Sequence, residues 1–206
     1  MMSRRFASAL VFLSLALGLH AGLAPSAAEA KPLPVGAQVP AATVKTVEGA
    51  DLDLAAAVAQ KPTLLIFYRG SWCPYCNKHL AALAEAEPEL LKLGYQILAL
   101  SPDDLPGLRM AAEKNHLNYR LLSDQAMQAA TAFGLAFRVN AKTIETYTGY
   151  GIKLASVPGE PDARWLPVPA VYIIGRDGRV KFVHTNPDYK ARLSAEQVLA
   201  AAQAAL

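Results

Sequence analysis

Runs of continuous apolar residues alternate along the chain with stretches of helical period. Residues 63–68 (TLLIFY) and 95–100 (YQILAL) are apolar at nearly every position, which is typical of short strands buried on both faces of a sheet. Between them, residues 73–94 carry leucines at helical spacing. We expect a helix here that Pro88 breaks and Gly94 ends.

The same alternation continues toward the carboxyl end. We expect further strands at 43–47, 119–122, 170–174 and 180–183, and further helices at 105–116, 125–133 and from a capping box of Ser194 and Gln197 to position 205. Residues 134–168 lack a clear period and are interpreted as an insertion that holds a helix near 143–147. This order of elements predicts one α/β domain with a mixed sheet over residues 31–206.

The first thirty residues have the layout of a secretory signal peptide. Arg4 and Arg5 supply the positive start, residues 7–19 are apolar, and Ala-Glu-Ala at 28–30 offers small residues for cleavage after Ala30. We therefore expect a periplasmic or secreted protein with no stable membrane insertion after cleavage. An uncleaved anchor is the alternative.

Composition and charge narrow the classes of protein further. The chain has 206 residues, of which 53% are hydrophobic and 18% charged, so a disordered chain is excluded. The formal net charge is only +3 and no run of Lys or Arg exceeds two, which argues against nucleic acid as a partner. Two cysteines can form neither a disulfide-rich miniprotein nor a four-cysteine zinc site.

The segment Cys73-Pro74-Tyr75-Cys76 carries the candidate chemistry, because it lies between an expected buried strand and an expected helix. At the amino end of a helix, unpaired N–H groups and the helix dipole lower the pKa of a cysteine such as Cys73. Pro74 suits the first turn because it needs no N–H partner there. Cys76 is close enough to close a disulfide, so one thiolate can attack and the other resolve. A purely structural disulfide is disfavoured, since so short a loop gains little from a cross-link.

The surroundings of the motif bear on metal and haem binding. Trp72 and Tyr75 would form an apolar surround for the two sulfurs. His79 could face an ion together with both cysteines, but no fourth ligand is visible, and a helical surface histidine is the alternative. Covalent haem attachment needs histidine directly after the second cysteine, where Asn77 stands. We therefore expect no metal and no cofactor.

Four stretches in order resemble the alkyl hydroperoxide reductase/thiol-specific antioxidant (peroxiredoxin-like) family of the thioredoxin superfamily, in a branch that contains CxxC. They are TLLIFYRGSWCPYC, ELLKLGYQILALSPDD, YRLLSDQAMQAATAFGL and PAVYIIGRDGRV. Together they extend over roughly residues 35–200. The resemblance implies a single thioredoxin-like α/β domain, in which helices flank a central mixed β-sheet.

The chain departs from the peroxiredoxin pattern Pro-x-x-x-Thr/Ser-x-x-Cys. Aligned on the preceding strand, Cys76 stands at the peroxidatic position, Cys73 at the hydroxyl position and Arg69 at the proline position. An arginine that usually precedes the late strand is replaced by Pro169. In the family the hydroxyl and the arginine stabilise charge on the leaving oxygen, and Arg69 or Arg164 is a candidate substitute in space.

Pro169 matches another branch of the same superfamily. In thioredoxin-like oxidoreductases a cis proline precedes a late strand opposite the CxxC motif, and Val168-Pro169 is suitably placed. Such a bond would turn the backbone of Val168 toward a bound polypeptide. An ordinary trans proline at the start of a strand is the alternative.

These observations favour an exported thiol–disulfide oxidoreductase in which Cys73 attacks and Cys76 resolves. Its expected substrate-binding residues are Arg69, Trp72, Tyr75, Val168 and Pro169. The expected partners are protein or small-molecule disulfides and thiols, together with a thiol-redox protein that recycles the pair.

Two alternatives stay open. In the first, the chain is a peroxidase that reduces hydroperoxides, with Cys76 peroxidatic and Cys73 resolving. The second is a copper chaperone on a thioredoxin fold, although such chaperones use CxxxC and a distant histidine, and no histidine occurs between Asn118 and Ile174.

Overall fold

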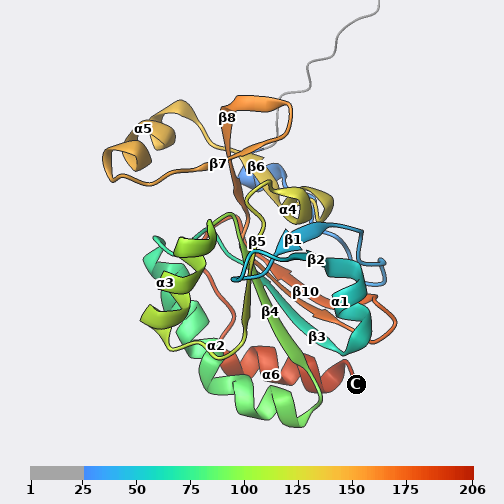
Figure 1. Ribbon diagram of the computed structural model, residues 1–206. Helices are drawn as coiled ribbons and strands as arrows, with labels where there is room; N and C mark the ends of the chain where they lie inside the picture. The colour runs from blue at the N-terminus through green and yellow to red at the C-terminus, as the bar shows by residue number, and fades with distance from the viewer. Residues whose placement is uncertain (1–25) are drawn as a thin grey trace, which may run out of the picture.

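A seven-stranded mixed sheet forms the centre of the computed structural model, which describes residues 26–206 (Figure 1). Its strands are β1 (Thr43–Lys45), β2 (Asp51–Asp53), β3 (Thr63–Phe67), β4 (Gln96–Ser101), β5 (Arg120–Ser123), β9 (Ala170–Ile174) and β10 (Val180–Thr185). The spatial order is β10-β9-β3-β4-β5-β1-β2. β3 pairs in parallel with β4 and antiparallel with β9, so the expected mixed sheet is confirmed.

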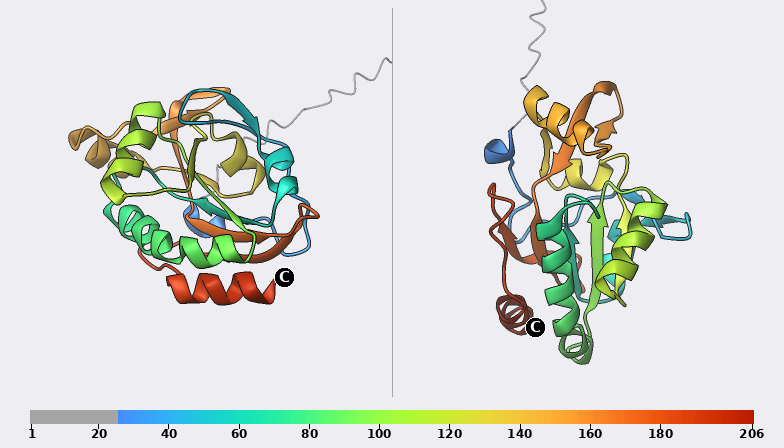
Figure 2. Two further views of the ribbon diagram at one scale, coloured as in Figure 1. Left: turned by 60° about the horizontal axis from the view of Figure 1, so that its bottom comes forward. Right: turned by 90° about the vertical axis from the view of Figure 1, so that its left-hand side faces the viewer.

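Helices cover both faces of this sheet. They are α1 (Leu54–Gln60), α2 (Pro74–Lys92), α3 (Leu105–Asn115), α4 (Gln128–Ala132) and α6 (Ala195–Ala204). A short 3-10 helix, η1 (Ala27–Glu29), precedes them, and α5 (Ala141–Gly149) lies outside both faces. α6 lies against α2 in Figure 2, and both belong with α3 to one hydrophobic core. α1 and α4 contribute to a second core on the opposite face.

The alternation of side chains along β3 explains why there are two cores. Leu64 and Ile66 point to the face covered by α2, α3 and α6, whereas Leu65 and Phe67 point to the other face. Every residue of β3 is buried. A continuous apolar run is therefore the pattern that a central strand of this sheet requires.

The expectation that Pro88 breaks the helix after the cysteines is wrong. α2 runs without interruption through Pro88 to Lys92. The proline removes one backbone donor, but Ala86, Glu87 and Leu90 on either side of it are buried against the core. Packing thus outweighs the loss of one helical hydrogen bond.

Residues 134–168 form regular secondary structure, although their hydrophobic residues follow no clear period. They form β6 (Ala136–Arg138), β7 (Ala155–Val157) and β8 (Glu160–Pro167), a separate antiparallel sheet of order β6-β8-β7, together with α5. This unit projects beyond one end of the main sheet (Figures 1 and 2). Two of its strands have only three residues, which is too short for an alternating pattern to be recognised.

The signal-peptide prediction falls on residues that lie, except for 26–30, outside the described part of the chain. Within 26–206, no helix combines the length and the apolar character needed to cross a membrane.

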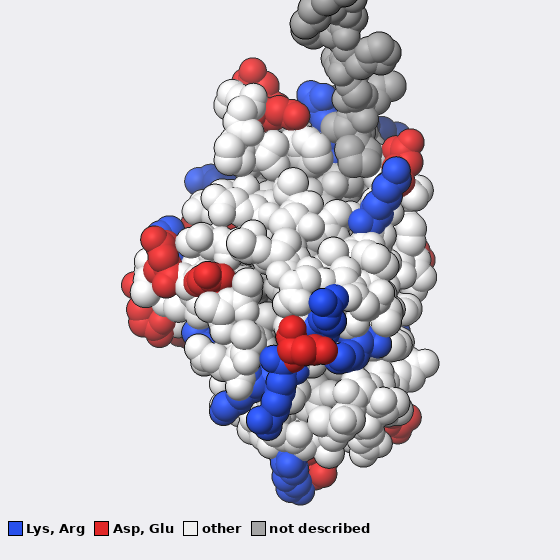
Figure 3. All heavy atoms as spheres, turned by 90° about the vertical axis from the view of Figure 1, so that its right-hand side faces the viewer, with Lys and Arg blue, Asp and Glu red and all other residues white. Residues whose placement is uncertain are grey.

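The face drawn in Figure 3 carries both positive and negative side chains, separated by broad uncharged areas. Exposed ion pairs such as Lys45–Asp51 and Lys181–Asp177 contribute little to stability.

The start of the described chain is tied to the end of α4. The Lys31 N–H donates to the Gly134 carbonyl over 3.1 Å, and the Leu33 N–H donates to the Phe133 carbonyl over 2.9 Å. Gly134 has a φ of +67°, and a Cβ at this position would lie 2.0 Å from the Lys31 carbonyl oxygen. Only glycine fits here for both reasons.

The Gly134→Ala variant is therefore expected to lose about 3 kcal/mol of the free energy of unfolding, through left-handed strain and a backbone clash. Gly151→Ala is the matched control, because Gly151 also has a positive φ, of +72°, but open space around its Cα. We expect it to lose only about 1 kcal/mol. Urea unfolding followed by circular dichroism measures both, and equal losses would contradict the clash at Lys31.

Candidate active site

The two cysteines lie where β3 passes into α2. Cys73 is the N-cap residue of α2, and Pro74 occupies the first turn as expected. Cys73 is 1% exposed and Cys76 is fully buried, and both are free thiols. The pair is thus placed at the positive end of the helix, close to the surface but sheltered from bulk water.

A half-buried carboxylate fixes the loop in front of the cysteines. Asp103, just after β4, accepts hydrogen bonds from the Ser71 N–H over 2.7 Å and from the Ser101 hydroxyl over 2.9 Å. The Asn77 side chain in turn donates to the Ser71 carbonyl over 2.8 Å. Burial raises the pKa of Asp103, while the serine hydrogen bonds oppose that shift. Asp103 and Asn77 are positioning residues that sequence reasoning missed.

The two thiols have opposite pKa shifts. A hydrogen bond from Cys76 lowers the pKa of Cys73 to about 6, against the effect of burial, with help from the charges of Arg69 and Arg192. Burial, followed by the same contact, raises the pKa of Cys76 well above that of a free thiol. Near neutral pH the site therefore holds a Cys73 thiolate beside a Cys76 thiol.

Arg192 reaches the pair from the segment that follows β10. Its Nη2 lies 3.6 Å from Cys76 Sγ, and its Nε donates to the Tyr189 carbonyl over 2.7 Å. This residue is 116 positions from Cys76 in the chain. No local motif marks it, so only the fold could identify it as part of the site.

Arg69 is buried among aromatic rings beside Cys73. Its guanidinium lies 4.1 Å from the ring centre of Tyr189 and 5.2 Å from that of Trp72, and it donates to the Tyr147 hydroxyl. Arg164, the other candidate substitute for the missing arginine, donates instead to nearby backbone carbonyls of β8. The structure therefore brings Arg69, and not Arg164, to the cysteines.

A cavity of about 410 Å³ opens onto Cys73. Its lining residues are Arg69, Trp72, Cys73, Pro74, Tyr75, Tyr147, Tyr150, Ile152 and Tyr189. Three of the five predicted substrate-binding residues are thus gathered around Cys73. Cys76 does not line this cavity, and Val168 and Pro169 do not line it either.

The expectation of a cis proline at 169 is wrong. Residues 26–206 contain no cis peptide bond. The Val168 N–H donates to the Leu135 carbonyl over 2.8 Å, and the Val168 side chain is only 2% exposed. Because this backbone donor is used within the protein, nothing requires the less favourable cis form, and Val168 offers no free N–H to a bound polypeptide.

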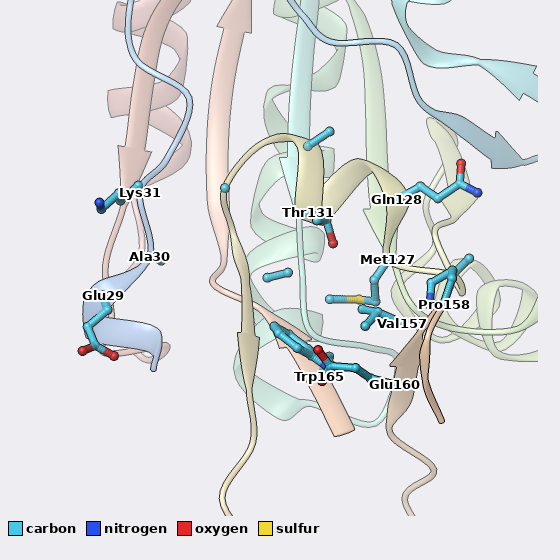
Figure 4. Close-up of a pocket in the computed structure, with 14 residues that line it drawn as sticks. Glu29, Ala30, Lys31, Met127, Gln128, Thr131, Val157, Pro158, Glu160 and Trp165 are labelled. Atoms are coloured by element: carbon cyan, nitrogen blue, oxygen red, sulfur yellow. The ribbon is translucent and has the colours of Figure 1, made fainter. Parts of the chain in front are cut away.

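A larger cavity lies elsewhere. About 790 Å³ in volume, it lies between Met127 and Thr131 near α4 and Trp165 of β8 (Figure 4). Its walls include neither cysteine and neither Arg69 nor Arg192. Size alone therefore does not identify the reactive site.

His79, predicted as a surface residue or a third metal ligand, is buried on α2 behind the cysteines. Burial and the nearby charge of Arg192 lower its pKa to about 4, although a hydrogen bond to the Leu193 backbone opposes that shift. Within residues 26–206, no group of three or more His, Cys, Asp or Glu side chains is arranged to hold a metal ion. His79 is thus a buried neutral imidazole, and its Nε2 has no hydrogen-bond partner in the described chain.

Comparisons with family models and with curated proteins point to the same family. The AhpC/TSA family matches residues 35–183. A putative peroxiredoxin bcp of Haemophilus influenzae is 36% identical over 104 residues, which are 50% of this chain and 66% of that protein. Peroxiredoxin Bcp of Escherichia coli is 32% identical over a segment of the same length and the same coverage. The chain thus spans just under two thirds of these relatives.

Solved structures show the same fold. Peroxidoxin BcpB from Mycobacterium tuberculosis superimposes with a TM-score of 0.63 at 20% identity, covering 84% of this chain and 97% of that one. Reduced Prx3 from Vibrio vulnificus in complex with H2O2 gives a TM-score of 0.67 at 20% identity, covering 82% and 99%. The expected thioredoxin-like α/β fold is therefore confirmed.

The hydrogen bond between the cysteines is testable by titration. Replacing Cys76 with alanine removes the donor, so the pKa of Cys73 should rise from about 6 toward the 9.0 of a free thiol. Cys76→Ser is the matched control, because its hydroxyl can still donate and should preserve most of the shift. The pH dependence of alkylation by iodoacetamide measures the pKa. An unchanged midpoint in Cys76→Ala would show that the backbone N–H of residue 76 and the arginines hold the thiolate instead.

His79 should make stability depend on pH. Its pKa falls from 6.5 in the unfolded chain to about 4 in the fold, so between these values only the unfolded chain takes up the proton. The stabilisation is complete above pH 6.5 and is lost as the pH falls toward 4, by about 3 kcal/mol. Urea unfolding of His79→Gln across this range should show a shallower slope, with His116→Asn as the exposed control. Parallel slopes for wild type and His79→Gln would contradict this role.

Proposed function

The chain belongs to the AhpC/TSA family, and from that premise we propose that it is a thiol peroxidase that reduces hydroperoxides with Cys73 and Cys76. Several relatives are named as peroxiredoxins, which favours hydroperoxide reduction over the disulfide exchange that the CxxC motif favours by itself. The chain is thus an oxidoreductase of the antioxidant type, and the peroxide is its proposed substrate.

One observation carries the proposal: an ionised sulfur faces a sheltered cavity beside a buried guanidinium. Cys73 lines the cavity together with Arg69, and its pKa of about 6 makes it a thiolate at neutral pH. A thiolate is the nucleophile that opens an O–O bond, and a nearby positive charge stabilises the oxygen that leaves.

The reaction would proceed in two balanced steps. The Cys73 thiolate attacks the terminal oxygen of ROOH, the O–O bond breaks, and Cys73 becomes a sulfenic acid while RO⁻ takes a proton from water. Cys76 then loses its proton and attacks the Cys73 sulfur. The Cys73–Cys76 disulfide forms and hydroxide leaves, taking up that proton as water. One hydroperoxide is reduced to an alcohol and water, and two thiols are oxidised.

These roles differ from those that the family pattern assigns. The pattern places the peroxidatic sulfur at Cys76, yet Cys76 is fully buried, is absent from the cavity wall and has a raised pKa. Cys76 must ionise before it attacks the sulfenic acid. The positive charge of Arg192, 3.6 Å away, stabilises the Cys76 thiolate at that step. We therefore assign attack to Cys73 and resolution to Cys76.

The proposal also includes a thiol reductant as partner and an exported location. A disulfide formed in each cycle has to be reduced, so a thiol reductant is a necessary partner. The leader-like residues 1–30 support an exported, oxidising compartment as the place of action.

Stopped-flow mixing of reduced protein with hydrogen peroxide and with an organic hydroperoxide tests the function. Wild type should consume peroxide at least about a hundredfold faster than a free thiol, and Cys73→Ser should not. Cys76→Ser should react once and accumulate a sulfenic acid on Cys73, which dimedone labels for mass spectrometry.

A small disulfide serves as the control substrate in the same apparatus. Slow reaction with both peroxides together with rapid exchange with the disulfide would overturn the peroxidase proposal. A dimedone label on Cys76 in the fast-reacting Cys73→Ser variant would reverse the assigned roles.

A further inference from the structure

Arg69 is a buried cation without an acidic partner. It is 5% exposed, and within residues 26–206 no carboxylate oxygen lies within 4.0 Å of its guanidinium. Its Nε is buried and has no hydrogen-bond partner. The half-buried carboxylate of the neighbouring loop, Asp103, is already engaged by Ser71 and Ser101. A charge in this position is costly unless an anion balances it.

The walls of the cavity that Arg69 shares with Cys73 bear no carboxylate, although Asp103 and Asp104 line a separate cavity that Arg69 also borders. The cavity lining contains aromatic and aliphatic residues and neither Asp nor Glu. Lys190 adds a second positive charge at the rim, with its Nζ 5.9 Å from the ring centres of both Tyr75 and Tyr189. The cavity is therefore positive, because Arg69 and Lys190 together outweigh the single Cys73 thiolate.

The charge balance of this cavity changes with the redox state. In the reduced protein the Cys73 thiolate lies beside Arg69 and lowers the cost of its burial. Once Cys73 and Cys76 are joined in a disulfide, the thiolate charge is gone and Arg69 has no anion beside it. The oxidised form therefore favours an incoming anion more than the reduced form does.

We propose that the cavity binds a small thiol carrying a carboxylate, which pairs with Arg69 and Lys190 while its sulfur reduces the disulfide. This inference rests on the proposed function, because it identifies the chemical class of the reductant. Cys73 is the sulfur that lines the cavity, so it is the one the thiol attacks.

The reduction balances with two molecules of thiol. The first thiolate attacks the Cys73 sulfur, forms a mixed disulfide with it and expels Cys76 as a thiolate, which Arg192 stabilises from 3.6 Å and which then takes a proton. A second thiolate attacks the sulfur of the bound reductant. It releases the small-molecule disulfide and returns Cys73 to its thiolate.

A hydroperoxide that carries a carboxylate could also pair with Arg69. Such a peroxide and the thiol reductant would react with different redox states of the protein, and this difference can be tested. A hydroperoxide meets the reduced protein, in which the Cys73 thiolate already balances Arg69 and repels a second anion. We therefore expect a preference for anionic reactants in the reduction of the disulfide and none in the reaction with peroxides.

The experiment compares three simple thiols that differ in charge. Protein oxidised with diamide is mixed with 3-mercaptopropionate, 2-mercaptoethanol or cysteamine, and free protein thiols are counted by acid quench, alkylation and mass spectrometry. Expressed per thiolate, the anionic thiol should react about tenfold faster than the neutral one, the range of a charge-assisted hydrogen bond. The cationic thiol should be the slowest. The preference should shrink as salt is raised.

Variants assign the preference to the cavity. Arg69→Gln should abolish it, Arg69→Lys should retain part of it, and Lys190→Gln should reduce it by a factor of about two to three. Lys61→Gln removes the same charge from the exposed residue before β3, at the other end of that strand, and should leave the preference unchanged. Lys190 is exposed, so replacing it should not disturb folding. Its variant therefore measures the effect of cavity charge even if Arg69→Gln fails to fold.

The reductant proposal is overturned if wild type reduces equally fast with anionic and neutral thiols, or if Lys190→Gln and Arg69→Lys keep the full preference. A faster reaction of reduced protein with an anionic peroxide than with a neutral one, without a preference among thiols, would assign the cavity to the substrate. Because diamide forms the disulfide, failure of the peroxidase assay would leave this result interpretable on its own.

Discussion

The contact of Cys76 with the Cys73 sulfur sets the charge of the site. It lowers the pKa of Cys73 to about 6, although burial opposes ionisation, and it adds to the burial that raises the pKa of Cys76. Two thiols in one helical turn thereby differ in charge near neutral pH. Arg69 and Arg192 favour the same arrangement, since each brings positive charge to the pair and neither forms an ion pair with a carboxylate in the described chain.

Three segments far apart in the chain have to meet to build this environment. The loop after β3 supplies the cysteines and Arg69, α5 of the 134–168 unit supplies Tyr147, and the segment after β10 supplies Tyr189 and Arg192. Tyr147 and Tyr189 are far apart in the sequence, and both contact the Arg69 guanidinium. The thioredoxin-like frame therefore positions the thiols, while the other two segments add the charge of Arg192 and part of the cavity wall.

The residues that sequence reasoning could identify are those whose signal is local. Continuous apolar runs predict β3, β4 and β9, and Pro74 after a cysteine predicts the start of α2. Ser194 and Gln197 form both hydrogen bonds of the predicted capping box. Each of these features depends on neighbours within a few positions, so pattern and propensity are sufficient.

The features that sequence reasoning missed depend on contacts that are remote in the chain. Arg192 has no local signature, Asp103 acts through a loop 32 residues away, and Pro88 is tolerated only because the core holds its helix. The Val168–Pro169 bond is trans, and the Val168 N–H is bonded to the Leu135 carbonyl, 33 positions away in the chain. The family pattern located the right segment, and the tertiary environment decided which sulfur carries the charge.

The stabilised thiolate also has a consequence for the reduction potential of the pair. Folding stabilises the ionised Cys73 of the reduced form, and the disulfide cannot share that stabilisation because it has no ionisable sulfur. The equilibrium between the two forms is therefore shifted toward the dithiol, and the potential is less negative than that of an ordinary structural disulfide. The electrostatics that ionise Cys73 therefore also make the disulfide easier to reduce to the dithiol.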